Sequence, residues 1–170
     1  MSASILVTYA TRYGSTKEVA ETIAADLREH GLEIVIQPLR QVRSLEGYRA
    51  VVMGAAFYIF HWHKDARHFL SKHRKELATR PVAIFALGPL PNTDEKGSAQ
   101  VQFTKVLAKH PWLTPVAAEM FGGKLDPARM HFPYNRMPAG DARDWQAIHR
   151  WAHSVAEKLQ PVVEPSSASV

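Results

Sequence analysis

Residues 5–23 read ILVTYATRYGSTKEVAETI, and this stretch decides how the rest of the chain is interpreted. The branched apolar run at residues 5–7 is typical of a strand that is buried on both faces. Farther along, four apolar residues recur at the spacing of one helix face: Ala20, Ile23, Ala24 and Leu27. The sequence therefore predicts a strand, a short turn and a helix.

The turn between this strand and helix is rich in hydroxyl groups and contains one glycine. The first N–H groups of a helix have no partner within it, so they attract anions that lie in front of the helix. Hydroxyl groups add donors, and a glycine lets the backbone approach a ligand closely. We expect a terminal phosphate here, held by the residues of the turn: Thr11, Arg12, Tyr13, Gly14, Ser15 and Thr16. The alternative is a hydroxyl-rich helix start that binds no ligand.

The residues around the turn exclude three other kinds of phosphate site. A P-loop requires GxxxxGK[ST], and the turn has no Gly-Lys pair. A dinucleotide site requires GxGxxG and an acidic residue near the end of the next strand, where Gln37 and Pro38 stand instead. A phosphate-receiving regulatory domain needs acidic residues after its first and third strands, and neither residues 8–9 nor residues 54–55 supply them.

The remaining pattern resembles that of the flavodoxin family. The family's first turn has an aromatic residue, then Ser or Thr two positions on, a small residue, a Thr and an Ala at fixed spacing. Five residues fit these positions: Tyr9, Thr11, Gly14, Thr16 and Ala20. Ile23 fits the apolar position that follows, whereas Thr8 departs from the family, which usually has an apolar or aromatic residue there. The resemblance implies an FMN cofactor with its phosphate in this turn.

Alternating strand and helix patterns predict a doubly wound α/β fold with a parallel sheet. Strands are expected at residues 5–7, 34–36, 50–53, 82–86 and 116–121. After the first helix, further helices are expected at residues 65–77, 98–108 and 141–159, with a short one near residues 42–45. Asp141 is the expected N-cap of the last helix. Five such strands suit a flavodoxin-like sheet of order 2-1-3-4-5, with helices on both faces.

Length and composition indicate how the chain is organised. Its 170 residues suit a single domain over residues 1–160, and the Ser- and Pro-rich residues 161–170 are expected to form a disordered tail. The absence of cysteine excludes disulfides and cysteine-ligated metal centres. No stretch approaches the roughly 20 apolar residues of a membrane span, and residues 1–4 lack a basic leader region, so we expect a cytoplasmic protein.

Two further loops follow strands at the edge of the sheet where the first turn lies. Residues 55–63, after the third strand, hold four aromatic residues, two histidines and no acid. Aromatic rings stack on a flavin and exclude water from it, so we expect part of this loop at the cofactor: Ala56, Phe57, Tyr58 and Trp62. Tyr58 and Trp62 are the stacking candidates. The alternative is that these rings pack beneath the following helix.

The loop after the fourth strand is the third candidate. Gly88 and Asn92 are expected to offer backbone N–H groups to the pyrimidine end of a flavin. An ordinary proline-rich turn is the alternative.

Charge and histidine content bear on partners and metals. The net charge is +5, and residues 64–80 carry six Lys or Arg against two acids. Such a surface suits an acidic redox partner protein, a small anionic substrate or an anionic membrane face, and no nucleic acid is expected. A solvated surface without a partner is the alternative. The histidines at residues 61–73 do not share one helix face, so no metal site is expected.

Within the flavodoxin superfamily, the chain resembles the menaquinone-dependent protoporphyrinogen dehydrogenases and their relatives. The similar pieces are Thr11-Arg12, Gly14, Gly54-Ala55, His61-Trp62-His63, Phe121-Gly122-Gly123 and Asp144-Trp145. Two features depart from that branch. Phe60 stands where the branch more often has glycine, and residues 124–140 are shorter than the branch's basic, apolar insertion, which is thought to bear on substrate and membrane contact.

These observations leave three hypotheses of function. The first is an FMN-binding redox protein that passes electrons to or from a partner, with no catalytic side chain required. The second is an FMN-dependent oxidoreductase of the protoporphyrinogen dehydrogenase type. The third is a non-enzymatic module with a degenerate flavin site, which Thr8 and Phe60 suggest.

Overall fold

The computed structural model describes residues 4–11, 14–58, 61–88, 93–129, 132, 134–136 and 139–161, with the backbone alone at 58, 61, 93–99, 125, 129 and 134. The parallel sheet of this part of the chain consists of β1 (Ser4–Ala10), β2 (Ile34–Pro38), β3 (Tyr48–Tyr58), β5 (Val82–Gly88) and β6 (Ala117–Gly122). Its order is β2-β1-β3-β5-β6, which confirms the expected order 2-1-3-4-5.

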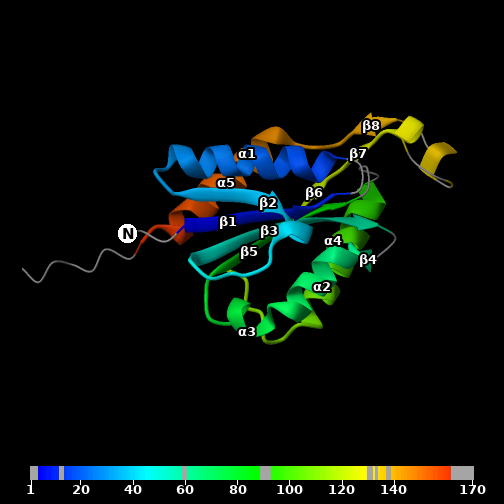
Figure 1. Cartoon of the computed structure of the whole chain (residues 1–170). Coiled ribbons are helices and arrows are strands. Elements are labelled where there is room, and N and C mark those ends of the chain that lie inside the picture. Colours follow the sequence, from blue (N-terminus) through cyan, green and yellow to red (C-terminus); the bar gives the residue numbers. More distant parts are fainter. Residues whose placement is uncertain are drawn as a thin grey trace, which may run out of the picture.

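Helices cover both faces of the sheet (Figure 1). One face packs against α1 (Ser15–Glu29) and α5 (Trp145–Leu159), and the other against α2 (Lys64–Lys72), α3 (Arg74–Leu77) and α4 (Thr93–Ala108). Short 3-10 helices are η1 (Leu39–Gln41), η2 (Pro127–Arg129) and η3 (Tyr134–Arg136). The fold is therefore the expected three-layer α/β sandwich.

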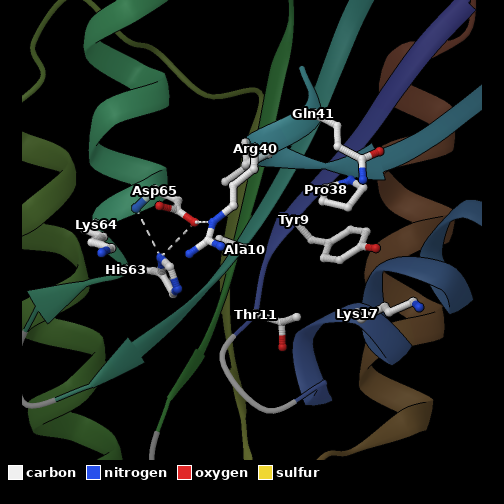
Figure 2. Close-up of a pocket in the computed structure, with 11 residues that line it drawn as sticks. Tyr9, Ala10, Thr11, Lys17, Pro38, Arg40, Gln41, His63, Lys64 and Asp65 are labelled. Carbon is white, nitrogen blue, oxygen red and sulfur yellow. Dashed lines mark hydrogen bonds and ion pairs between the residues drawn. The ribbon is translucent and has the colours of Figure 1, made fainter. Parts of the chain in front are cut away.

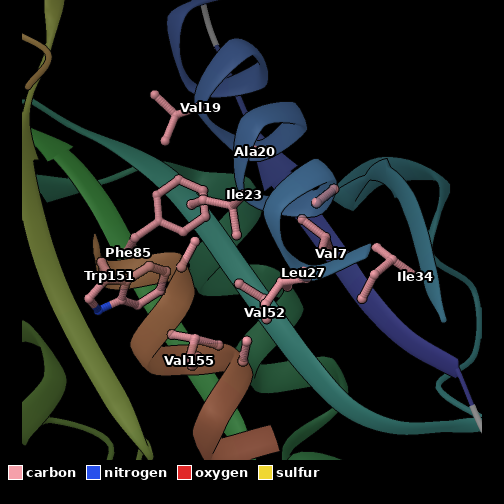
Figure 3. Close-up of a cluster of buried hydrophobic side chains, with 14 of the residues drawn as sticks. Val7, Val19, Ala20, Ile23, Leu27, Ile34, Val52, Phe85, Trp151 and Val155 are labelled. Carbon is pink, nitrogen blue, oxygen red and sulfur yellow. The ribbon is translucent and has the colours of Figure 1, made fainter. Parts of the chain in front are cut away.

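Strand β1 divides its side chains between two cores, because successive residues of a strand point to opposite faces. Ile5 and Val7 join the core under α1 and α5, while Leu6 joins the core under α2. All three are fully buried. Figure 3 shows the first core, where the rings of Phe85 and Trp151 lie 5.8 Å apart. Burial on both faces explains the continuous apolar run in the sequence.

The third strand is longer than expected, because residues 55–58, which were expected in a loop, continue β3. Ala55 pairs with Ala10 on one side and Ala86 on the other, so this segment lies inside the sheet. The chain then returns in β4 (His61–Trp62), which pairs antiparallel with the end of β3. The segment after residue 54 is thus a hairpin rather than an open loop.

The helix expected at residues 65–77 is interrupted at His73, which ends α2 with φ −105° and ψ 20°. The ring of His73 is buried, lies 4.8 Å from the ring of Phe69 and has Nδ1 3.2 Å from a carboxylate oxygen of Glu76. The expected buried face is confirmed, since Phe69, Leu70, His73 and Leu77 are all buried. The expected continuity of the helix was wrong.

The last helix starts later than expected. Asp144 caps α5, accepting a hydrogen bond of 3.0 Å from the Ala147 N–H. Asp141, the expected cap, lies instead in β8 (Gly140–Asp141), which pairs with β7 (Lys124–Leu125). Two smaller corrections concern α4, which begins at Thr93 rather than residue 98, and the short helix, which lies at Leu39–Gln41 rather than at residues 42–45.

Candidate functional site

The turn that leads from β1 into α1 is shaped by Gly14 and Thr11. Gly14 has φ 92°, a left-handed conformation that other residues adopt only with strain, and nothing lies within 4 Å of where its Cβ would be. The requirement for glycine is therefore conformational rather than spatial. The Gly14 N–H donates to Thr11 Oγ1 over 2.8 Å, which leaves the Thr11 hydroxyl proton for another acceptor.

Among the described residues, no side chain caps the first N–H groups of α1. Gly14 is the N-cap and supplies no side-chain hydrogen bond to the first helical N–H groups. Ser15 and Thr16, the next two residues, are buried, and the hydroxyl of Thr16 has no hydrogen-bond partner within the described part of the chain. A buried hydroxyl without a partner costs about 1–3 kcal/mol. An anion in front of the helix would therefore meet unsatisfied donors, so these residues fit a phosphate.

In the structure Thr11, Gly14, Ser15 and Thr16 lie together in this turn, and their contact with a phosphate stays a prediction. Arg12 and Tyr13, from the same turn, and Asn92 lie outside the described residues. For Tyr58 the structure describes only the backbone, at the end of β3.

The other described candidates from the segment after residue 54 are buried. Ala56 and Phe57 are buried strand residues. The side chain of Trp62 is 2% exposed, its Nε1–H donates to the Ala55 carbonyl over 3.3 Å, and its ring lies 5.9 Å from that of Phe103 in α4. This corrects the expected stacking role of Trp62, because a ring buried beneath a helix has no free face for a flavin.

Gly88 ends β5 at the same edge of the sheet and pairs with Gly122 of β6. A Cβ on Gly123 would collide with the carbonyl oxygen of Gly88, so two glycines allow the chain after β6 to lie against the end of β5. The carboxyl ends of β1, β3 and β5 therefore meet at one edge of the sheet, where the turn into α1 lies.

Sequence reasoning missed Arg143, which ties the start of α5 to the start of α1. Its side chain is 4% exposed. The guanidinium donates to both carboxylate oxygens of Asp141, over 2.9 and 2.7 Å, and to Glu18 over 2.8 Å. It also lies 3.5 Å from the Ser15 carbonyl oxygen and 4.8 Å from the centre of the Trp145 ring. Its main partner in α1 is 125 residues away, so no local motif could have indicated this contact.

The charges of Arg143 and Asp141 stabilise one another. The side-chain hydrogen bonds to Asp141 raise the pKa of Arg143, against the opposing effect of burial. The same hydrogen bonds hold the pKa of Asp141 below its ordinary value. Both groups are therefore ionised over the whole neutral range, so the ion pairs of Arg143 with Asp141 and Glu18 hold the segment before α5 against the first turn of α1.

Two features are absent from the described residues. No group of three or more His, Asp or Glu side chains there is arranged to hold a metal ion. No helix in that part of the chain has the length and apolar character needed to cross a membrane.

Comparison with known proteins identifies the class of this molecule. Residues 6–137 match the family described as a flavodoxin domain, Flavodoxin_5, so the chain belongs to the flavodoxin-domain family. Flavodoxin 1 from Bacillus cereus has the same fold, with a TM-score of 0.61, 16% identity and coverage of 92% of this chain and 99% of that one.

Two proteins similar in sequence carry one particular name. Protoporphyrinogen IX dehydrogenase (quinone) of Escherichia coli K12 is 25% identical over 171 residues, which cover 89% of this chain and 93% of that protein. The protein of the same name from Leishmania major is 26% identical over 176 residues, covering 91% of this chain and 75% of that protein. The branch resemblance noted from short motifs thus extends over most of the chain.

Proposed function

We propose that this chain is a flavodoxin-like FMN-binding redox protein, with one domain over residues 1–160, that transfers electrons to or from a partner. The observation that carries the proposal is the turn into α1, where the left-handed Gly14 and the buried, unpartnered hydroxyl of Thr16 stand at an uncapped helix start. Membership of the flavodoxin-domain family supports a flavin as the ligand of this turn.

Different residues of the chain would bind the phosphate and the ring of the cofactor. The hydroxyls of Thr11, Ser15 and Thr16, with the first N–H groups of α1, would hold the phosphate. The backbone near Tyr58 and Gly88 would face the flavin ring, and Arg12, Tyr13 and Asn92 complete the proposed set, whereas Ala56 is buried inside β3. The bound flavin supplies the redox chemistry, while the protein orients it and limits the access of water.

The positive charge of the region after β4 bears on the partner. Lys64, Arg67, Lys72 and Lys75 are exposed in α2 and α3. Arg80 differs from them, because it donates to the carbonyls of residues 45 and 48 over 2.7 and 2.6 Å and so has a structural role. The exposed cations suit an acidic redox protein or a small anionic substrate. They should also favour the anionic reduced flavin, giving a reduction potential less negative than that of acidic flavodoxins.

The second candidate function is an FMN-dependent oxidoreductase of the protoporphyrinogen dehydrogenase type. It is favoured by the two relatives of that name, which align with about nine-tenths of this chain. The third hypothesis, a degenerate site, loses part of its basis. Thr8 is fully buried within β1, so its departure from the family pattern alters the core rather than the turn.

One set of experiments separates these functions. The purified chain is incubated with FMN, freed of excess cofactor and examined by visible absorbance, and failure to retain FMN would contradict the proposal. The loaded protein is then reduced stepwise without oxygen. Two one-electron steps support the carrier, whereas a single two-electron step, with FMN-dependent turnover of protoporphyrinogen and a menaquinone analogue, supports the oxidoreductase.

A further inference from the structure

A cavity of about 810 Å³ opens beside the turn into α1, on the side where β2 ends (Figure 2). Its walls come from the end of β1, the η1 segment, the start of α2 and one residue of α1, Lys17. Its volume lies within the range of sites that bind small organic molecules. Thr11 lines the cavity, but Gly14, Ser15 and Thr16 do not, so it is separate from the helix start where we place the flavin phosphate.

The lining combines an apolar surface with an excess of positive charge. The apolar part consists of Tyr9, Ala10, Pro38 and Leu39. Among the described lining residues, the charged side chains are three cations, Lys17, Arg40 and Lys64, and one carboxylate, Asp65; Lys17 Nζ also lies 3.9 Å from Glu21 Oε1 in an exposed pair. Figure 2 shows Arg40 and Lys17 on opposite sides of the Tyr9 ring. An organic anion would match both parts of this lining.

Arg40 is the residue best placed to receive the acid group. Its Nε donates to Asp65 Oδ2 over 2.8 Å, and its side chain is 73% exposed. Asp65 is itself held at the start of α2, where its backbone N–H donates to His63 Nδ1 over 3.1 Å. Among the described residues, Asp65 is the hydrogen-bond partner of Arg40, and the bond uses one of the five donors of a guanidinium. The bond through Nε therefore orients the guanidinium of Arg40, while its two terminal nitrogens can still donate to an anion in the cavity.

We propose that this cavity binds a small organic anion, whose apolar body lies on Pro38 and the accessible edge of Tyr9 and whose phosphate or carboxylate is bound by Arg40. A guanidinium fork receives either acid in a bidentate manner. Lys17 and Lys64 add charge that draws the anion to the cavity. Since Thr11 belongs both to the cavity wall and to the turn, the anion would lie next to a bound flavin, the position of a substrate or an effector.

The test uses three probes with the same aromatic body: naphthyl phosphate, naphthoate and the neutral naphthalene methanol. Each is titrated calorimetrically into the full chain, with and without FMN. We expect the two acids to bind at least about tenfold more tightly than the alcohol, because charge-assisted hydrogen bonds are stronger than neutral ones. The tighter of the two acids identifies the acid group that the cavity prefers.

Matched variants assign the binding to the cavity. Arg40→Gln should weaken both acids about tenfold and leave the alcohol unchanged, since it removes one charge-assisted contact. Lys17→Gln provides a second, independent loss of charge at the cavity. The control is Arg150→Gln, which removes an equal charge from an exposed site on α5 that does not line the cavity.

The proposal is overturned if the acids bind no more tightly than the alcohol, or if Arg40→Gln and Arg150→Gln have equal effects. It is also overturned if the acids compete with FMN, since the cavity would then be part of the flavin phosphate site. FMN retention is measured separately on each variant. If the unaltered chain does not bind FMN, the proposed function is contradicted, whereas the cavity proposal is judged by the binding of the acids alone.

Discussion

The guanidinium of Arg143 lies 2.8 Å from the carboxylate of Glu18, which stands 125 residues earlier in the chain. This contact joins the segment between β8 and α5 to the first turn of α1. The same guanidinium approaches the carbonyl of Ser15, a residue of the proposed phosphate turn. The position of the turn is thus linked to a part of the chain that is distant in sequence.

Replacing Arg143 by Met should lower the free energy of unfolding by about 2–3 kcal/mol, because the hydrogen bonds to Asp141 and Glu18 are lost together. Arg143→Lys should recover only part of this, since an ammonium group cannot form the two parallel bonds to Asp141. Urea denaturation of the three proteins measures both differences. Equal stabilities for wild type and Arg143→Met would show that the contact is not maintained in solution.

The contribution of Asp141 to stability should depend on pH. Its pKa is lowered in the folded protein, first of all by the hydrogen bonds from Arg143. Its stabilising effect is therefore complete above the pKa of the unfolded chain, about 3.9, and declines as the pH falls through the lower folded value. Urea denaturation should show Asp141→Asn less stable than wild type near neutral pH, with the gap closing in acid. A gap that widens on acidification would contradict this assignment.

Two buried hydroxyls without partners allow a matched comparison, Thr8 in β1 and Thr16 in α1. Replacing either by Val removes an unsatisfied polar group, so each variant should be as stable as wild type or up to about 1 kcal/mol more stable. Only Thr16→Val should weaken FMN binding, by about tenfold or more, if its hydroxyl contacts the phosphate. Titration of FMN fluorescence measures the affinity, and equal affinities of the two variants would separate Thr16 from the site.

Gly54 makes room for the ring of Phe85, with which it pairs across β3 and β5. A Cβ at Gly54 would overlap that ring, so Gly54→Ala should destabilise the protein by about 2–3 kcal/mol. Combining it with Phe85→Leu should cost less than the sum of the two single changes, because the smaller side chain relieves the overlap. As the control, Gly54→Ala should be additive with Phe103→Leu, which lies in the other core.

The positions of the strands and of the turn could be predicted because both depend on local patterns, whereas the order of the sheet was predicted from the resemblance to the flavodoxin family. Apolar runs such as residues 5–7 mark buried strands, and small residues around Gly14 mark the turn. Predictions from local patterns failed where a contact with another part of the structure determines the position of a side chain. From the sequence, Trp62 is expected to be an aromatic residue in an open loop. In the structure β4 pairs with β3, and this pairing places Trp62 beneath α4. Asp141 reads as a helix cap, yet Arg143 engages it in β8.

The measurement that tests the central claim most directly compares the affinities of the unaltered chain for FMN and riboflavin, which differ only in the phosphate. Quenching of flavin fluorescence on titration with protein gives both dissociation constants. If the turn into α1 holds the phosphate through two or more charge-assisted hydrogen bonds, FMN should bind at least about 100-fold more tightly. Equal affinities, or no binding of either flavin, would contradict the assignment of this turn as the phosphate site.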